Sequence, residues 1–95
     1  MLKKVDKAPD EVIAEVTLRE LLSKVLGLAE DQVGGFAEST ALFGSLPEFD
    51  SMAVANFLTA LEERLGIIIE DDDVDAEHFA SFGSLLAFVE RLQSR

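Results

Sequence analysis

The chain has 95 residues, of which 48% are hydrophobic, and it carries a formal charge of −11. This length suits one domain with a thin core, which leaves little room for a deep enzyme pocket, and the hydrophobic content argues against global disorder. There is no cysteine, so disulfides and thiolate metal sites are excluded. No apolar run approaches a membrane span and the N-terminus lacks a signal-peptide pattern, so we expect a cytoplasmic protein without membrane insertion.

The acidic residues are unevenly distributed along the chain. Eight of the 19 lie between Glu62 and Glu77, and Arg64 is the only lysine or arginine between Lys24 and Arg91. Such a field repels phosphate backbones and anionic membranes and attracts basic protein surfaces. The pattern therefore excludes nucleic-acid binding, and it indicates either a solubilising surface or a docking surface for basic proteins.

A first helix is predicted from apolar residues at helical spacing, namely Leu18, Leu21, Leu22, Val25 and Leu26. Residues 17–20, Thr-Leu-Arg-Glu, have the spacing of a capping box, and Gly27 is suited to end the helix. Residues 9–16 could lengthen the helix upstream, with Ile13 and Val16 continuing the apolar stripe, so its start stays open.

The apolar residues between positions 29 and 49 keep neither helical nor strand spacing for more than a few residues. This pattern predicts a long loop packed over the core. A second helix is predicted from residues 50–51 to about Leu65, followed by Gly66 as its terminating residue. Its expected buried stripe consists of Val54, Phe57, Leu58, Leu61 and Leu65. Residues 67–69, three isoleucines, have no partner strand in the sequence and are interpreted as an apolar connector.

A short helical turn is expected over residues 75–79, and a last helix with Ser81 as its N-cap. The inward face of that helix is predicted to hold Phe82, Leu85, Leu86 and Val89. The fold class predicted is all-α, a small antiparallel four-helix bundle of three main helices and one short one, with a long loop between helices one and two. We expect one domain over residues 1–95, with residues 1–10 as a flexible segment.

Two kinds of catalytic or metal site are weighed and set aside. Residues 71–75 alternate Asp as a calcium loop does, but Ala76 and Phe82 stand where that loop needs Gly and Glu, so no metal site is expected. His78 is the sole histidine, and no serine lies in a Gly-x-Ser-x-Gly motif, so a hydrolytic triad is not expected either. The sequence favours a protein that is not an enzyme.

The remaining motif is Asp50-Ser51-Met52 at the start of the second predicted helix, with Leu61-Glu62-Glu63 near its far end. With the helix order, the length and the charge, it resembles the acyl carrier protein family over about residues 18–92. That resemblance implies a 4'-phosphopantetheine arm, transferred from coenzyme A to Ser51 by a phosphopantetheinyl transferase, which carries an acyl group as a thioester. A helix N-terminus suits the added phosphodiester, because free N–H groups and the helix dipole favour negative charge there.

Departures from the family indicate a specialised carrier rather than the one of housekeeping fatty acid biosynthesis. Ala53 and Asn56 stand where fatty-acid-synthesis carriers usually have acids, so the expected acidic recognition surface is kept only at Glu62, Glu63 and residues 70–75. Residues 46–54 are similar to carriers associated with bacterial exopolysaccharide and exosortase gene sets. The resemblance implies an acyl-activating ligase or acyltransferase as partner.

Partner contacts are expected at five positions near or along the second helix, namely Phe49, Ala53, Asn56, Glu62 and Glu63, and the protein is expected to be a monomer. Two alternatives stay open. A peptidyl or aminoacyl carrier shares the fold, and Met52 does not separate it from an acyl carrier. An unmodified acidic module that binds a basic protein partner would use the same helix without an arm at Ser51.

Overall fold

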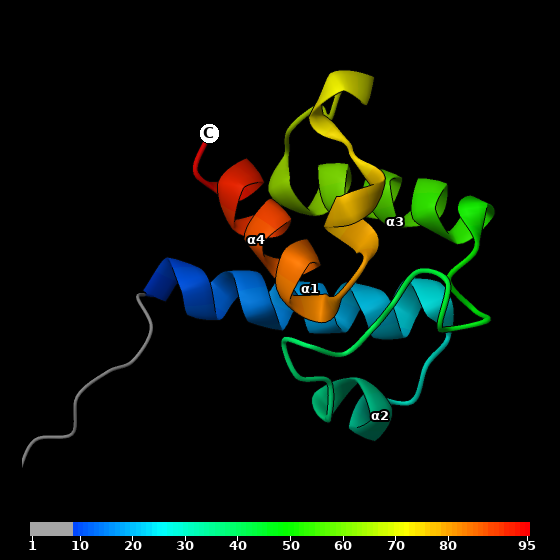
Figure 1. Cartoon of the computed structure of the whole chain (residues 1–95). Coiled ribbons are helices and arrows are strands. Elements are labelled where there is room, and N and C mark those ends of the chain that lie inside the picture. The colour runs from blue at the N-terminus through cyan, green and yellow to red at the C-terminus, as the bar shows by residue number, and fades with distance from the viewer. Residues whose placement is uncertain (1–8) are drawn as a thin grey trace, which may run out of the picture.

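The computed structural model describes residues 9–95. Within that range the structure is helical, and its only β-type pairing is an isolated bridge. The helical elements are α1 (Pro9–Leu26), α2 (Glu30–Gly34), α3 (Ser51–Leu65), the 3₁₀ turns η1 (Asp71–Asp73) and η2 (Ala76–Phe79), and α4 (Phe82–Gln93). Figure 1 shows α1 at the centre, α3 running back antiparallel to it, and α2 beneath it. The predicted bundle of three main helices is confirmed, and none of the described helices is long and apolar enough to cross a membrane.

The first helix includes the upstream residues, and the capping box expected at residues 17–20 does not form. The helix already begins at Pro9, and Thr17 is a buried residue in its middle, 5% exposed. Because residues 9–16 are already helical, the backbone N–H groups that a capping box at Thr17 would satisfy have carbonyl partners within the helix. The predicted flexible segment 1–10 lies outside the described residues except for its last two, which are helical.

The inward face of the first half of α1 also differs from the prediction. Ile13 is 54% exposed and Val16 49%, whereas Ala14 and Leu18 are fully buried. The core-facing positions are therefore 14, 18, 21 and 22, which follow the three-to-four residue spacing of a helix. As predicted, the helix ends before Gly27, whose φ of 71° is a left-handed conformation that favours glycine.

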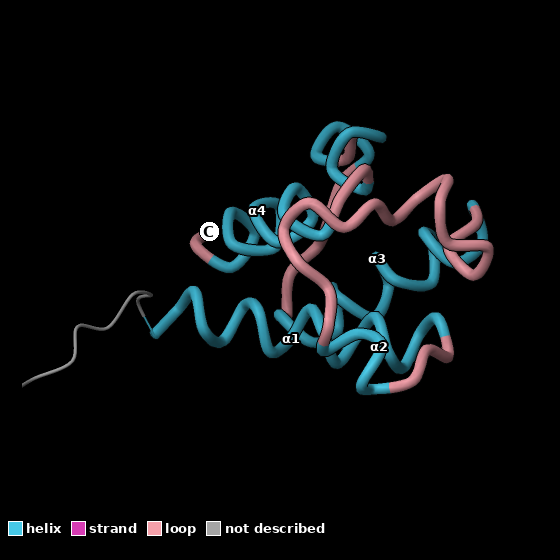
Figure 2. The backbone as a smooth tube through the Cα atoms, turned by 60° about the horizontal axis from the view of Figure 1, so that its bottom comes forward, coloured by secondary structure: helices cyan, strands magenta, loops and turns pink. Residues whose placement is uncertain are grey.

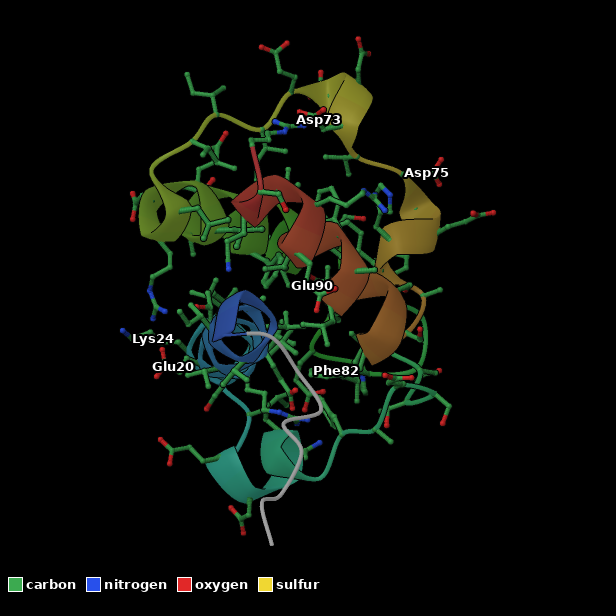
Figure 3. All side chains as sticks on the ribbon, turned by 90° about the vertical axis from the view of Figure 1, so that its left-hand side faces the viewer. Glu20, Lys24, Asp73, Asp75, Phe82 and Glu90 are labelled. Atoms are coloured by element: carbon green, nitrogen blue, oxygen red, sulfur yellow. The ribbon has the colours of Figure 1, made fainter. Side chains whose placement is uncertain are left out.

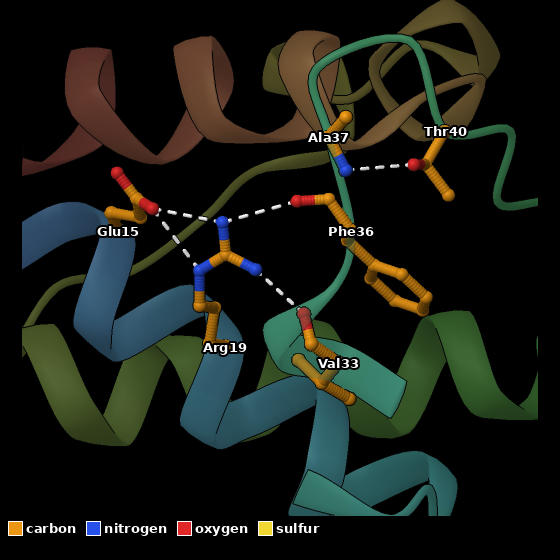
Figure 4. Close-up of polar contacts among 6 residues, drawn as sticks. All are labelled: Glu15, Arg19, Val33, Phe36, Ala37 and Thr40. Carbon is orange, nitrogen blue, oxygen red and sulfur yellow. Dashed lines mark hydrogen bonds and ion pairs between the residues drawn. The ribbon is translucent and has the colours of Figure 1, made fainter. Parts of the chain in front are cut away.

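The long segment between α1 and α3 contains a short helix that the sequence pattern did not predict, α2. Arg19 of α1 holds it: Nη1 donates to the carbonyl of Val33 (2.6 Å) and Nη2 to that of Phe36 (3.2 Å), as Figure 4 shows. The same guanidinium bonds Glu15 at 2.8 Å and lies 4.5 Å from the ring centroid of Phe82. One partly buried cation thus joins α1, the end of α2 and the start of α4.

The rest of the long segment, drawn as loop in Figure 2, pairs with the chain just before and inside α4. Leu42 and Phe43 donate their backbone N–H groups to the carbonyls at positions 80 and 79, both at 3.0 Å. In return Phe82 and Gly83 donate to the carbonyls at positions 40 and 38, at 2.8 and 2.9 Å. A Cβ on Gly83 would lie 2.9 Å from that last carbonyl oxygen, so the close approach requires glycine.

Helix α3 matches its prediction at both ends, with Asp50 as N-cap and Gly66 in the left-handed conformation after its last turn. Phe57 and Leu61 are fully buried, whereas Val54, Leu58 and Leu65 of the predicted stripe are only partly buried. Helix α4 has its predicted N-cap Ser81, and all four predicted inward residues, Phe82, Leu85, Leu86 and Val89, are buried together with Phe88 and Leu92.

The connector between α3 and α4 carries the acidic run. Residues 67–69 form no strand, as predicted, and the predicted turn at residues 75–79 is η2 with Asp75 as its N-cap. A second turn, η1, was not predicted. Figure 3 shows Asp73 and Asp75 on this segment, on the far side of the body from Glu20 and Lys24 of α1.

Burial of α3 against α1 provides the first test of the fold. Leu61→Ala should lower the free energy of unfolding by about 2–5 kcal/mol, because it removes a fully buried side chain and leaves a cavity. Ile68→Ala is the matched control, since Ile68 is 75% exposed and its truncation should cost little. Chemical denaturation measures both, and equal losses for the two variants would contradict this packing.

Candidate functional site

Ser51 is the first residue of α3, and its side chain is exposed. Its hydroxyl makes no hydrogen bond to any of the described residues, so it is free to react. Asp50 before it is extended (φ −97°, ψ −174°), and its Oδ1 accepts the backbone N–H of Ala53 at 2.8 Å. Asp50 therefore caps the helix, while Ser51 beside it stays accessible at the positive end of the helix dipole.

The approach to Ser51 is fixed by an aromatic cluster. Phe49 is 2% exposed and packs edge-to-face against Phe57 at 6.3 Å and Phe79 at 5.7 Å between ring centroids. Phe43 joins it from the loop at 6.2 Å. The prediction that Phe49 lies at a partner-binding surface is therefore wrong, because burial of its ring among three others makes it part of the core.

Ala53 is also buried, at 8% exposure, so the expectation that it lies on the exposed side of the helix is wrong. Positions 53, 57 and 61 follow the four-residue spacing of one helix face, which brings all three to the core. Asn56 is exposed as expected, and Met52 is 70% exposed directly after Ser51. Met52 and Asn56 are therefore among the exposed residues near Ser51, and a carboxylate at position 53 would be buried.

A pocket of about 190 Å³ lies beside Ser51. Its lining is Phe43, Ser51, Val54, Val74, Ala76 and Phe79, so apart from the serine hydroxyl all of these side chains are apolar. The loop, α3 and η2 each contribute to it, and the backbone bond from Phe43 to the carbonyl of Phe79 joins two of these walls. The sequence analysis did not identify this pocket, because its residues come from three separate segments of the chain.

The two glutamates near the far end of α3 differ in their surroundings. Glu63 is exposed, but Glu62 is half-buried, and its Oε2 accepts the backbone N–H of Ile69 at 2.7 Å. The expectation that both lie on the solvated side of the helix is therefore wrong for Glu62. Its carboxylate holds the connector in place, so that Ile67 and Ile69 pack on the core.

Comparison with known proteins supports the family assignment. Residues 16–89 match the sequence profile of the phosphopantetheine attachment site family. The chain is also similar to the holo form of an acyl carrier protein from Nitrosomonas europaea, whose solution structure has 40% sequence identity and a TM-score of 0.74. That alignment covers 86% of this chain and 96% of the other. No curated protein sequence shows a significant match to this chain.

An exposed serine at a capped helix start, on a small helical bundle, is the arrangement of a phosphopantetheine-dependent carrier domain, and this is the class of protein that the fold and the comparisons indicate. The chain belongs to the acyl carrier protein family. Members of this family are carriers rather than enzymes and work with partner enzymes such as transferases and synthases. The prosthetic group is phosphopantetheine, and the start of α3 fits it, because a serine hydroxyl is exposed there beside backbone N–H groups.

The cap at the start of α3 yields a prediction for stability. Asp50→Ala should cost about 0.5–2 kcal/mol of unfolding free energy, because the N–H of Ala53 loses its acceptor. Asp50→Asn keeps an acceptor oxygen at the same place and should cost much less. Amide exchange at position 53 reports the same bond, and equal protection in the alanine variant and the parent would contradict the cap.

Proposed function

We propose that Ser51 is the attachment site of the phosphopantetheine arm and that the protein shuttles an acyl group, held as a thioester, between partner enzymes. The observation that carries this proposal is the free, exposed hydroxyl at the N-terminus of α3. A phosphodiester on this oxygen would lie near the unpaired N–H groups of the first turn, which favour its negative charge. Asp50 and Met52 flank it, the first by holding the turn and the second as an exposed apolar contact.

The pocket beside Ser51 supports an apolar acyl group over an aminoacyl group. Its lining offers no charged side chain to an α-ammonium, and burying an unpaired ammonium is costly. Its volume of about 190 Å³ corresponds to about six water molecules, which suits a short apolar chain or the first part of a longer one. This chemistry supports an acyl rather than a peptidyl carrier.

The absence of acids from the first turn of α3 supports a role in a specialised pathway, such as that of the exopolysaccharide- and exosortase-associated carriers. Enzymes that recognise acids beside the attachment serine would find the exposed pair Met52 and Asn56 there instead. We assign the partners as a phosphopantetheinyl transferase and an acyl-activating ligase or acyltransferase with basic surfaces. The carrier acts as a cytoplasmic monomer in this proposal.

The attachment site is tested by incubating the purified protein with coenzyme A and a broad-specificity phosphopantetheinyl transferase. Mass spectrometry should find one arm on the parent protein and none on Ser51→Ala. Ser45→Ala is the matched control, because Ser45 is an exposed serine of the preceding loop and its loss should leave loading intact. An arm on the Ser51→Ala variant would move the site, and no arm on the parent would favour the unmodified interaction module.

Docking is tested through Glu63, the exposed member of the glutamate pair. Glu63→Lys should lower kcat/KM for loading by the transferase several-fold at low salt, because it reverses a charge that attracts a basic surface. The difference from the parent should shrink as salt rises and exposed charges are screened.

Two further charge reversals separate docking from folding. Glu30→Lys, on the exposed side of α2, is the matched control and should have a smaller effect. Glu62→Lys should lower thermal stability as well, because Ile69 loses the acceptor of its N–H. Loading by Glu63→Lys that equals the parent at every salt concentration would remove this residue from the docking surface.

A further inference from the structure

Met52 holds the only sulfur atom of the chain besides that of Met1, since there is no cysteine. Met1 lies outside the described residues. Met52 is the second residue of α3, directly after Ser51, and its side chain is 70% exposed. It is not among the residues that form or cover the hydrophobic core. The thioether is therefore accessible to oxidants, and the packing of the core does not depend on it.

The residues of α3 beside Ser51 offer a partner apolar contacts rather than charges. No acidic residue lies in the first turn, and Glu62 is the first charged residue of the helix. Phe43, which lines the pocket beside Ser51, adds a second large apolar side chain, 43% exposed. Neighbouring apolar side chains that stay exposed are typical of a surface that a partner covers, and methionine suits such surfaces because its flexible thioether adapts to the partner. We expect docking at this end of α3 to depend on apolar burial more than on charge.

Oxidation changes this side chain from apolar to polar. Hydrogen peroxide transfers one oxygen atom to the thioether sulfur, which loses two electrons, and the other peroxide oxygen leaves as water. The sulfoxide formed carries a polar acceptor oxygen, and burying that oxygen without a donor costs free energy. The step is reversible, because methionine sulfoxide reductases return the oxygen as water while two thiols are oxidised to a disulfide.

We propose that Met52 is a peroxide-sensitive modification site and that its oxidation to the sulfoxide weakens the docking of partner enzymes at Ser51. The effect on docking rests on the proposed function, because it requires that an enzyme acts on Ser51, whereas the oxidation itself does not. A docking surface made of carboxylates keeps its charge under peroxide. The uncharged start of α3 instead loses its most exposed apolar group, while the fold is unaffected because that group already lies in water.

The modification is tested on the whole protein with hydrogen peroxide, which is removed before coenzyme A and a broad-specificity phosphopantetheinyl transferase are added. Peptide mass spectrometry should find one added oxygen at Met52, formed about as fast as on free methionine. The kcat/KM for loading should fall about tenfold, since burial of one methionine side chain is typically worth at least that factor. The midpoint of thermal unfolding should not change, and treatment with methionine sulfoxide reductases of both epimer specificities should restore loading.

Three variants separate the thioether from other effects of peroxide. Met52→Leu has no sulfur at this position, so its own loading rate should be the same before and after peroxide. Met52→Gln carries a polar acceptor there and should be loaded without treatment about as slowly as the oxidised parent. Ile68→Gln is the matched control, because Ile68 is equally exposed but lies on the connector after α3, and its loading should equal that of the parent.

Several outcomes would overturn the switch while leaving attachment at Ser51 intact. One is equal loading of the oxidised and the untreated parent. Others are an equal loss on peroxide treatment in Met52→Leu, or a lowered unfolding midpoint of the oxidised parent, because both would place the effect outside the docking contact. No arm on the untreated parent would instead overturn the proposed function together with the effect on docking, although the sulfoxide at Met52 would still be detected by mass.

Discussion

The backbone pairing between residues 38–43 and residues 79–83 is the constraint on which the rest of this structure depends. It supplies acceptors for the N–H groups of Phe82 and Gly83, which belong to the first turn of α4 and have no partner inside that helix. It also holds Phe43 and Phe79 on facing sides of the pocket beside Ser51. The sequence of the long loop has no helical or strand periodicity. The loop is thus ordered by hydrogen bonds to the backbone of residues 79–83.

Together with two further sets of contacts, this pairing fixes the position of Ser51 on a small core. Arg19 joins α1 to the loop at Val33 and Phe36, and the aromatic rings around Phe49 fix the residue just before the cap. The aromatic rings around Phe49, the guanidinium of Arg19 and the backbone hydrogen bonds all hold the loop in place. The main helices pack against one another through their apolar faces. The serine at the start of α3 therefore lies on a rigid helix end, reached by a loop that has little freedom.

The charge of the molecule has two distinct uses. Some carboxylates are structural: Glu62 holds the connector through Ile69, Asp50 caps α3 and Asp73 pairs with Arg95. Others, among them Glu63, are exposed and contribute to the negative field around the molecule. Part of the net charge of −11 therefore comes from acids that also hold the fold together.

The sequence by itself determined the main helices, both ends of α3, the N-cap of α4 and the carrier family, because caps, glycine stops and apolar spacing are local signals. Only the tertiary structure decided the buried face of the first half of α1 and that of the first turn of α3. Thr17 has the sequence spacing of a capping box, but in the structure the residues before it are already helical. Ala53 was expected to be exposed, but its face of α3 packs toward α1. The pocket beside Ser51 joins residues distant in the chain, and local patterns do not encode the packing that brings them together.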